Sequence, residues 1–171
     1  MTDRPEPTAA HAAKTSGFAV PIDQRYFEDY RVGSTYEYGP TAVDQDEAIA
    51  FARAFDPQPI HVDPVAAANG PFGGLIISGW HTAGLMMRLF VDNYLSSVAS
   101  LASPGIDELR WFKPVRPGDQ LKIRVSVTDS RRSRTKPDRG MVRTTIEILN
   151  QHGEIVSSMI AMNLLRCRPS R

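Results

Sequence analysis

DPQPIHVD, residues 56–63, holds a carboxylate and an imidazole five residues apart, with two prolines between them. Each proline fixes its own φ angle and disfavours helical backbone at the residue before it. Asp56 and Gln58 are therefore expected to be extended, and the link from Asp56 to His61 is expected to be stiff. Proton transfer needs an acid and a base that reach one small volume without further ordering. Asp56 and His61 are the candidate catalytic pair.

A helix is expected directly before this segment. Asp44 is a candidate N-cap, with Glu47 three residues later as in a capping box, and Pro57 must end the helix. Residues 33–43 are expected to form a strand ahead of it. Between Asp44 and Pro57 apolar residues recur at helical spacing, namely Ala48, Ile49, Phe51, Ala52 and Phe55.

A long apolar helix is expected after the segment. Asp63 is a candidate cap for a short helix over 64–68, and glycine-rich turns follow it. Ser78 is then a candidate N-cap for a helix that runs to about Ser100. This helix is apolar over most of its circumference, so other elements should surround it.

The C-terminal third changes from helical to strand periodicity. Alternating apolar and polar residues predict four strands in succession, at 106–112, 121–127, 142–148 and 154–165. One strand, then helices, then four strands predicts an α+β fold in which an antiparallel sheet curls around the long helix.

Composition predicts one domain. The chain has 171 residues, and the Pro- and Ala-rich residues 1–22 predict a disordered arm before a domain at 23–168. A net charge of +1 gives no case for a nucleic-acid or membrane surface as partner. The single Cys167 excludes an intrachain disulfide and suits the cytoplasm, and no secretory signal is visible at the N-terminus.

Four separated motifs resemble the MaoC-like dehydratases, which include the (R)-specific enoyl-CoA hydratases of the hot-dog fold. The resemblance covers roughly residues 25–166 and implies a single hot-dog domain. The motifs fall in the family's order: FEDYRVG (27–33), FARAFDPQPIHVD (51–63), FGGLIISGW (72–80) and PVRPGDQL (114–121).

The resemblance implies addition of water to a 2-enoyl thioester of coenzyme A, or its removal, without a metal or a redox cofactor. Asp56 would take a proton from the water, and His61 would orient that water and assist protonation at Cα. The backbone N–H of Gly79 would bind the thioester oxygen, because a helix N-terminus has free donors and a partial positive charge.

The chain differs from the family pattern around the expected pocket. Gln58 stands where the family has Asn, Phe55 where Gly is frequent, and Ser78 where His is frequent. Gln58 and Ser78 are therefore expected to be substrate-binding positions that alter the choice of acyl group.

Several residues have a simpler alternative role. Asp56 could merely end a helix, although a carboxylate there opposes the helix dipole by about 0.3–1 kcal/mol. His81 is expected to be core or pocket lining, and Trp111 and Phe112 core or subunit contact. The basic run at 131–139 is expected to be a solvated hairpin, or else a contact for the phosphates of coenzyme A.

Two other functions remain open. A thioesterase of the same fold would need a carboxylate on or near the long helix, where no acidic residue precedes Asp92. A non-catalytic acyl-CoA-binding subunit would be favoured by loss of Asp56 or His61, and both are present. One such unit leaves a sheet edge and part of the helix uncovered, so a homodimer or larger homo-oligomer is expected.

Overall fold

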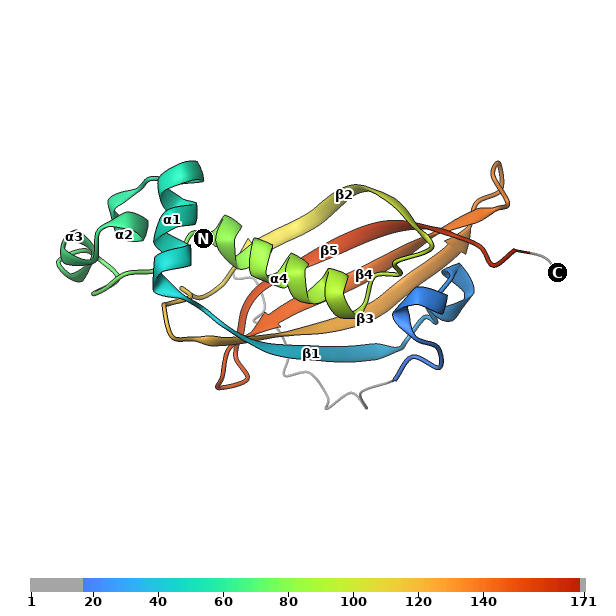
Figure 1. Cartoon of the computed structure of the whole chain (residues 1–171), viewed down its shortest axis with the longest axis horizontal. Coiled ribbons are helices and arrows are strands. Elements are labelled where there is room, and N and C mark those ends of the chain that lie inside the picture. The colour runs from blue at the N-terminus through green and yellow to red at the C-terminus, as the bar shows by residue number, and fades with distance from the viewer. Residues whose placement is uncertain (1–16, 170–171) are drawn as a thin grey trace, which may run out of the picture.

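The computed structural model describes residues 17–169 and shows a long helix, α4, lying against one face of a five-stranded antiparallel sheet (Figure 1). The strand order is β1-β3-β4-β5-β2, so β1 and β2 are the edges. The predicted α+β class is confirmed. The helices are α1 (Gln45–Phe55), α2 (Pro59–Val62), α3 (Pro64–Ala68) and α4 (Gly79–Asn93), and the strands are β1 (Thr35–Ala42), β2 (Ser100–Trp111), β3 (Gln120–Arg132), β4 (Arg139–Leu149) and β5 (Ile155–Arg166).

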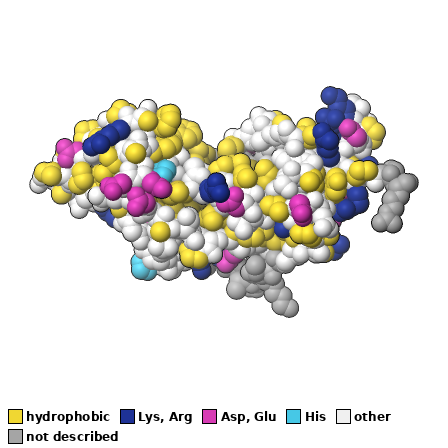
Figure 2. Space-filling model, in the orientation of Figure 1, with side chains coloured by type: hydrophobic (Ala, Val, Ile, Leu, Met, Phe, Trp, Pro, Cys, Tyr) yellow, Lys and Arg dark blue, Asp and Glu magenta, His cyan; other side chains and the backbone are white. Residues whose placement is uncertain are grey.

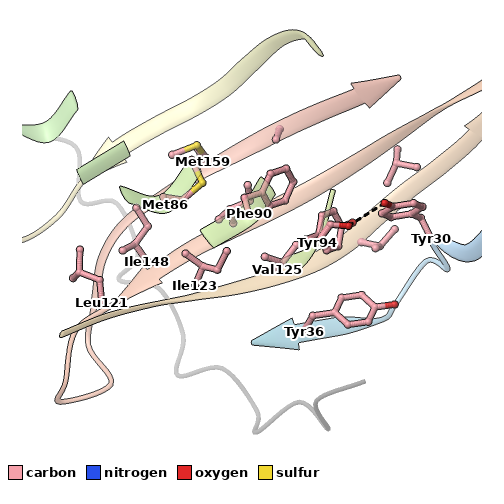
Figure 3. Close-up of a cluster of buried hydrophobic side chains, with 14 of the residues drawn as sticks. Tyr30, Tyr36, Met86, Phe90, Tyr94, Leu121, Ile123, Val125, Ile148 and Met159 are labelled. Carbon is pink, nitrogen blue, oxygen red and sulfur yellow. Dashed lines mark hydrogen bonds between the residues drawn. The ribbon is translucent and has the colours of Figure 1, made fainter. Parts of the chain in front are cut away.

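The core lies between α4 and the sheet. Alternate residues of β3, such as Ile123 and Val125, are fully buried and lie in one cluster with Met86, Phe90 and Tyr94 of α4 (Figure 3). Burying one such large apolar side chain stabilises the fold by about 1.5–3 kcal/mol. The period-2 pattern of the sequence therefore identified the face of the sheet that α4 covers.

The long helix is shorter than predicted, and the expectation that it runs to about Ser100 is wrong. α4 ends at Asn93, and β2 begins at Ser100. The Arg25 guanidinium donates to the carbonyl oxygens of Asn93 (2.7 Å) and Tyr94 (3.0 Å). These carbonyls at the C-terminal end of α4 therefore have a cationic donor, which also interacts favourably with the helix dipole. The Ser96 hydroxyl then accepts the N–H groups of the next turn, which leads into β2.

Ordered packing begins before the predicted domain boundary at residue 23. Residues 1–16 of the predicted arm lie outside the described residues. Phe18, within the predicted arm, stacks on Tyr36 with ring centroids 4.2 Å apart, and the Arg25 guanidinium lies 3.7 Å from the Phe18 ring centre. The aromatic core therefore extends to this residue.

The local caps agree with the sequence. The Asp44 carboxylate accepts the N–H of Glu47, and the Asp63 carboxylate accepts the N–H groups at the start of α3. α2 was not predicted as a helix. Within residues 17–169 no helix combines the length and the hydropathy that crossing a membrane requires.

Tyr30 joins the N-terminal segment to the end of α4. Its hydroxyl donates to the Tyr94 carbonyl (3.0 Å) and accepts the Ser96 N–H (2.8 Å), and burial raises the pKa of Tyr30 to about 12. Tyr30→Phe leaves the buried Ser96 N–H without this partner and removes one of the two donors to the Tyr94 carbonyl, which keeps Arg25. We therefore expect it to lower the free energy of unfolding by about 1–3 kcal/mol in urea. Tyr36→Phe is the control, because the Tyr36 hydroxyl bonds to no described residue. Equal losses in the two variants would contradict this role.

Candidate active site

Asp56 is placed by the end of α1. Its N–H still donates to the Ala52 carbonyl (2.8 Å), but its φ and ψ of −152° and 66° take the chain out of the helix. Gln58 is extended as expected, at −78° and 142°, whereas Asp56 lies between the helical and extended regions. The Asp56 side chain is 19% exposed, so its carboxylate is accessible from one side.

His61 is placed by α2, a single helical turn that Pro59 begins. Its Nδ1 lies 2.9 Å from the carbonyl oxygen of Ile76. A carbonyl only accepts hydrogen bonds, so Nδ1 carries the hydrogen, and in the neutral imidazole Nε2 presents its lone pair. Nε2 lies 3.4 Å from Oδ2 of Asp56. The prolines thus bring the two groups together as predicted, with a helical turn inside the link.

Two hydrogen bonds hold the Asp56 carboxylate. Gln58 Nε2 donates to Oδ1 and Ser78 Oγ donates to Oδ2, both at 2.7 Å. Gln58 first and Ser78 second hold the pKa of Asp56 below its ordinary value, His61 adds to this effect, and partial burial opposes it. Asp56 is therefore a carboxylate at neutral pH and accepts hydrogen bonds only.

Ser78 is also the N-cap of α4. Ser78 is fully buried, and its hydroxyl accepts the N–H of Trp80 (3.3 Å) while it donates to Asp56. The N–H of Gly79, the first residue of α4, donates to no group in the described part of the chain. Gly79 lines the pocket described next, so a free backbone donor at a helix N-terminus lies beside the Asp–His pair, Asp56 and His61.

An apolar pocket of about 360 Å³ opens in front of this pair. Aromatic side chains of two elements form its wall, and Trp80 and Trp111 meet edge to face with ring centroids 5.5 Å apart. The pocket is lined by Asp56, His61, Phe72, Ile76, Ile77, Gly79, Trp80, Thr82, Trp111, Phe112, Lys113, Pro114 and Val115.

Trp111 explains why residue 79 is glycine. Its indole N–H donates to the Gly79 carbonyl (3.1 Å), and a Cβ at residue 79 would lie 2.5 Å from the Trp111 ring. Real Cβ atoms essentially never approach another atom so closely. The close packing sets the wall of the pocket beside the free N–H.

The geometry suits a single bound water. When the imidazole of His61 is neutral, its Nε2 and the carboxylate of Asp56 are both acceptors, so neither donates to the other across 3.4 Å. A water molecule has two hydrogens and satisfies both acceptors at once. In that form the spacing of the two acceptors is compatible with one water between them.

Of the other predicted site residues, Gly79 lines the pocket, whereas Gln58 and Ser78 lie outside its wall. Gln58 is exposed and Ser78 is buried, and both contact Asp56 instead of lining the pocket. His81 is core: it is 8% exposed, and it stacks on Phe51 with ring centroids 5.0 Å apart.

Sequence reasoning missed the aromatic wall. Trp111 and Phe112 were expected to be core or subunit contact, but they are 45% and 53% exposed and line the pocket, so the core assignment is wrong. Their position just before the PVRPGDQL motif, from which only Lys113 separates them, was the available signal. Arg116 of that motif donates to the carbonyls of Phe72 and Leu75, which holds the glycine-rich loop against the pocket.

Metal binding was not expected from the spacing of the histidine and acidic residues. Within residues 17–169, His, Cys, Asp and Glu side chains nowhere form a group of three that could hold a metal ion. Asp63, two residues after His61, is the N-cap of α3, and its carboxylate accepts two backbone N–H groups of that helix.

Comparison with known proteins identifies the family. A family model described as "MaoC like domain" matches residues 28–149. The 3-hydroxyacyl-thioester dehydratase Z of Mycobacterium tuberculosis is 32% identical over 126 residues, which are 72% of this chain and 82% of that protein.

Solved structures agree in fold. The MaoC-like dehydratase from Rhodospirillum rubrum superposes with a TM-score of 0.79 at 38% identity, covering 85% of this chain and 99% of that one. The (R)-hydratase from A. caviae has a TM-score of 0.65 at 25% identity, covering 81% and 97%. The predicted hot-dog fold is confirmed.

The bond from Gln58 gives a direct test of the site's electrostatics. Because the pKa of Asp56 is lowered, the carboxylate stays ionised as the pH falls until that lower value is reached. Gln58→Ala removes the largest cause, so we expect the Asp56 carboxyl to protonate at a higher pH in a ¹³C NMR titration, with Asp56→Asn assigning the signal. Asn69→Ala is the control, because the Asn69 amide donates to the Val65 carbonyl. An unchanged titration in Gln58→Ala would contradict this account.

Proposed function

Because this chain belongs to the MaoC-like domain family, we propose that it hydrates 2-enoyl thioesters of coenzyme A or dehydrates the 3-hydroxyacyl thioesters. One observation carries the proposal: His61 Nδ1 is bonded to the Ile76 carbonyl, so Nε2 faces the Asp56 carboxylate at 3.4 Å on the wall of an apolar pocket. The name of the related M. tuberculosis protein, a 3-hydroxyacyl-thioester dehydratase, supports the same class of reaction.

The proposed hydration uses one water. As the water oxygen bonds to Cβ of the enoyl group, Asp56 takes one of its protons, and His61 Nε2 holds the other hydrogen in place. The proton is returned from the pair to Cα, so the sum is addition of H and OH across the double bond. Because both residues lie on one side of the substrate, both groups arrive at the same face.

The charge that gathers on the thioester oxygen needs a donor. The Gly79 N–H is the candidate, because it is free among the described residues, lines the pocket and begins a fifteen-residue helix. A helix N-terminus has a partial positive charge, and a fixed donor of this kind is worth about 10²–10³ in rate.

The reaction sets limits on what else is needed. Adding water to a double bond changes no net oxidation state, so we propose no redox cofactor, and coenzyme A enters only as part of the substrate. The buried thiol of Cys167 is compatible with the cytoplasm, which is our proposed location.

The two rival functions gain no support from the geometry. Asp92, the first acidic residue of α4, forms an exposed ion pair with Arg88 (2.7 Å) near the end of the helix remote from Gly79. It does not line the pocket, as a thioesterase carboxylate on this helix would. A non-catalytic subunit would not need the hydrogen bonds from Ser78 to Asp56 and from His61 to the Ile76 carbonyl, which hold the two side chains close together.

We also propose that two copies pair along β2. This edge strand has no buried side chain, and the outward side of α4 exposes Trp80, Met87 and Val91, which are 59%, 44% and 44% exposed. Trp80 and Trp111 belong both to this surface and to the pocket, so a second copy would complete the pocket wall.

Sedimentation velocity should give at least twice the mass of one chain, and a monomer at micromolar concentration would contradict the pairing.

The catalytic pair is tested by two substitutions. Asp56→Asn and His61→Ala should each lower kcat on the best enoyl-CoA substrate by at least about 10²-fold, the scale of general acid–base catalysis. Hydration is followed by the loss of ultraviolet absorbance of the conjugated thioester. Asp63→Asn and His152→Ala are the controls, because these residues lie outside the pocket. Near-parental turnover in either Asp56→Asn or His61→Ala, with the fold intact, would refute the assignment.

The oxyanion donor needs a matched comparison, because any side chain at residue 79 also meets Trp111. Gly79→Ala adds the Cβ and keeps the N–H, whereas Gly79→Pro adds the Cβ and removes the N–H. Proline is tolerated at the first helical position, and the ψ of 137° at Ser78 suits a following proline. We expect kcat of Gly79→Pro to be about 10²–10³-fold below that of Gly79→Ala. Equal kcat values would show that the glycine serves packing only.

A further inference from the structure

A second cleft, of about 500 Å³, lies at the other end of the sheet. The tip of the β3–β4 hairpin and the residues after β5 form it, and basic side chains gather at this end of the molecule (Figure 2). Of the basic run at 131–139, Arg132 and Arg139 line the cleft, and the C-terminal segment contributes Arg166 and Arg168. The cleft is lined by Arg132, Pro137, Asp138, Arg139, Arg166, Cys167, Arg168 and Pro169.

The arginines of this cleft are incompletely neutralised. Arg139 forms a two-point ion pair with Asp138 (2.9 and 2.8 Å), and Arg168 pairs with Asp29 (2.7 Å). The Arg132 guanidinium donates to the backbone carbonyl of Pro137, and the Arg166 guanidinium forms no hydrogen bond or ion pair with any residue in the described part of the chain. Two guanidinium groups therefore have no carboxylate partner among residues 17–169.

The sheet register adds an unfavourable contact. Arg139 of β4 stands directly opposite Arg166 of β5. Like charges at directly opposed positions destabilise a sheet. Asp138 neutralises Arg139, whereas Arg166 has no such partner among the described residues, so a bound anion would stabilise this end of the sheet. The planar donors of arginine match the oxygens of a phosphate group, to which they bind through two parallel hydrogen bonds.

This cleft is separate from the proposed catalytic pocket. Ser157 pairs with Trp111 of the pocket wall, and Arg166 follows nine residues later on the same strand. At about 3.3 Å per residue these positions are roughly 30 Å apart. Cys167 in the cleft wall is buried, and burial raises the pKa of its thiol, so the cleft is suited to binding and not to nucleophilic chemistry.

We propose that this cleft binds a phosphorylated ligand, with Arg166 and Arg132, whose guanidinium groups have no carboxylate partner in the described part of the chain, as the principal donors. The phosphate groups could come from two sources. One source is the coenzyme A of a substrate bound to a neighbouring subunit, which rests on the proposed function; the other is a free phosphate or diphosphate, which does not.

Inorganic pyrophosphate is the probe for the cleft, with binding measured by isothermal titration calorimetry at low salt. We expect saturable binding that weakens as salt is added, and Arg166→Gln should weaken it by about tenfold or more. Arg131→Gln is the matched control: it removes the same charge from the same end of the sheet, but Arg131 is 81% exposed, pairs with Asp129 and does not line the cleft. We expect its affinity to stay within about twofold of the wild type.

Kinetics separate the two sources of phosphate. If coenzyme A is the ligand, Arg166→Gln raises KM for crotonyl-CoA and leaves KM for crotonyl-pantetheine unchanged. If the ligand is free, both KM values stay unchanged while pyrophosphate binding is lost. Asp56→Asn should bind pyrophosphate as the wild type does, so failure of the proposed chemistry is distinguishable. No saturable binding, or equal losses in Arg166→Gln and Arg131→Gln, would overturn the proposal.

Discussion

The packing of α4 against the sheet is the constraint on which the rest of the structure depends. Burial of Met86, Phe90 and Tyr94 against the strands fixes the helix along the sheet and therefore fixes where it begins. The free N–H of Gly79 and the hydroxyl of Ser78 take their positions from that point. A shift of α4 would move the candidate oxyanion donor and the support of the Asp56 carboxylate together.

Ser78 links the start of α4 to the Asp56 carboxylate, because it caps the helix and donates a hydrogen bond to Asp56. The carboxylate of Asp56 lies at the end of α1, where the helix dipole opposes it by about 0.3–1 kcal/mol. Hydrogen bonds to a charged group contribute about 1.5–3 kcal/mol each, so those from Ser78 and Gln58 outweigh the dipole. Gln58 and Ser78, two residues at which this chain was expected to differ from the family pattern, therefore lower the pKa of Asp56. Other residues form the pocket wall.

Local sequence signals predicted most of the fold and the central pair of the site. Caps at Asp44, Asp63 and Ser78 marked helix starts, and period-2 alternation marked the strands. The end of α4 was not predictable in this way, because Arg25, which satisfies it, lies 68 residues away in the sequence. The basic run at 131–139 was noted as a possible phosphate contact, but the aromatic wall and the C-terminal arginines of the cleft were missed for the same reason: each site joins segments that only the folded sheet brings together.

The central claim is that one water, held between Asp56 and His61, supplies both the hydroxyl group and the route for the proton. The stereochemistry of hydration in D₂O tests it most directly, with the relative configuration at Cα and Cβ of the product measured by NMR. We predict that the deuterium and the hydroxyl group add to the same face of the double bond. Addition to opposite faces, or a mixture of the two products at Cα, would contradict it.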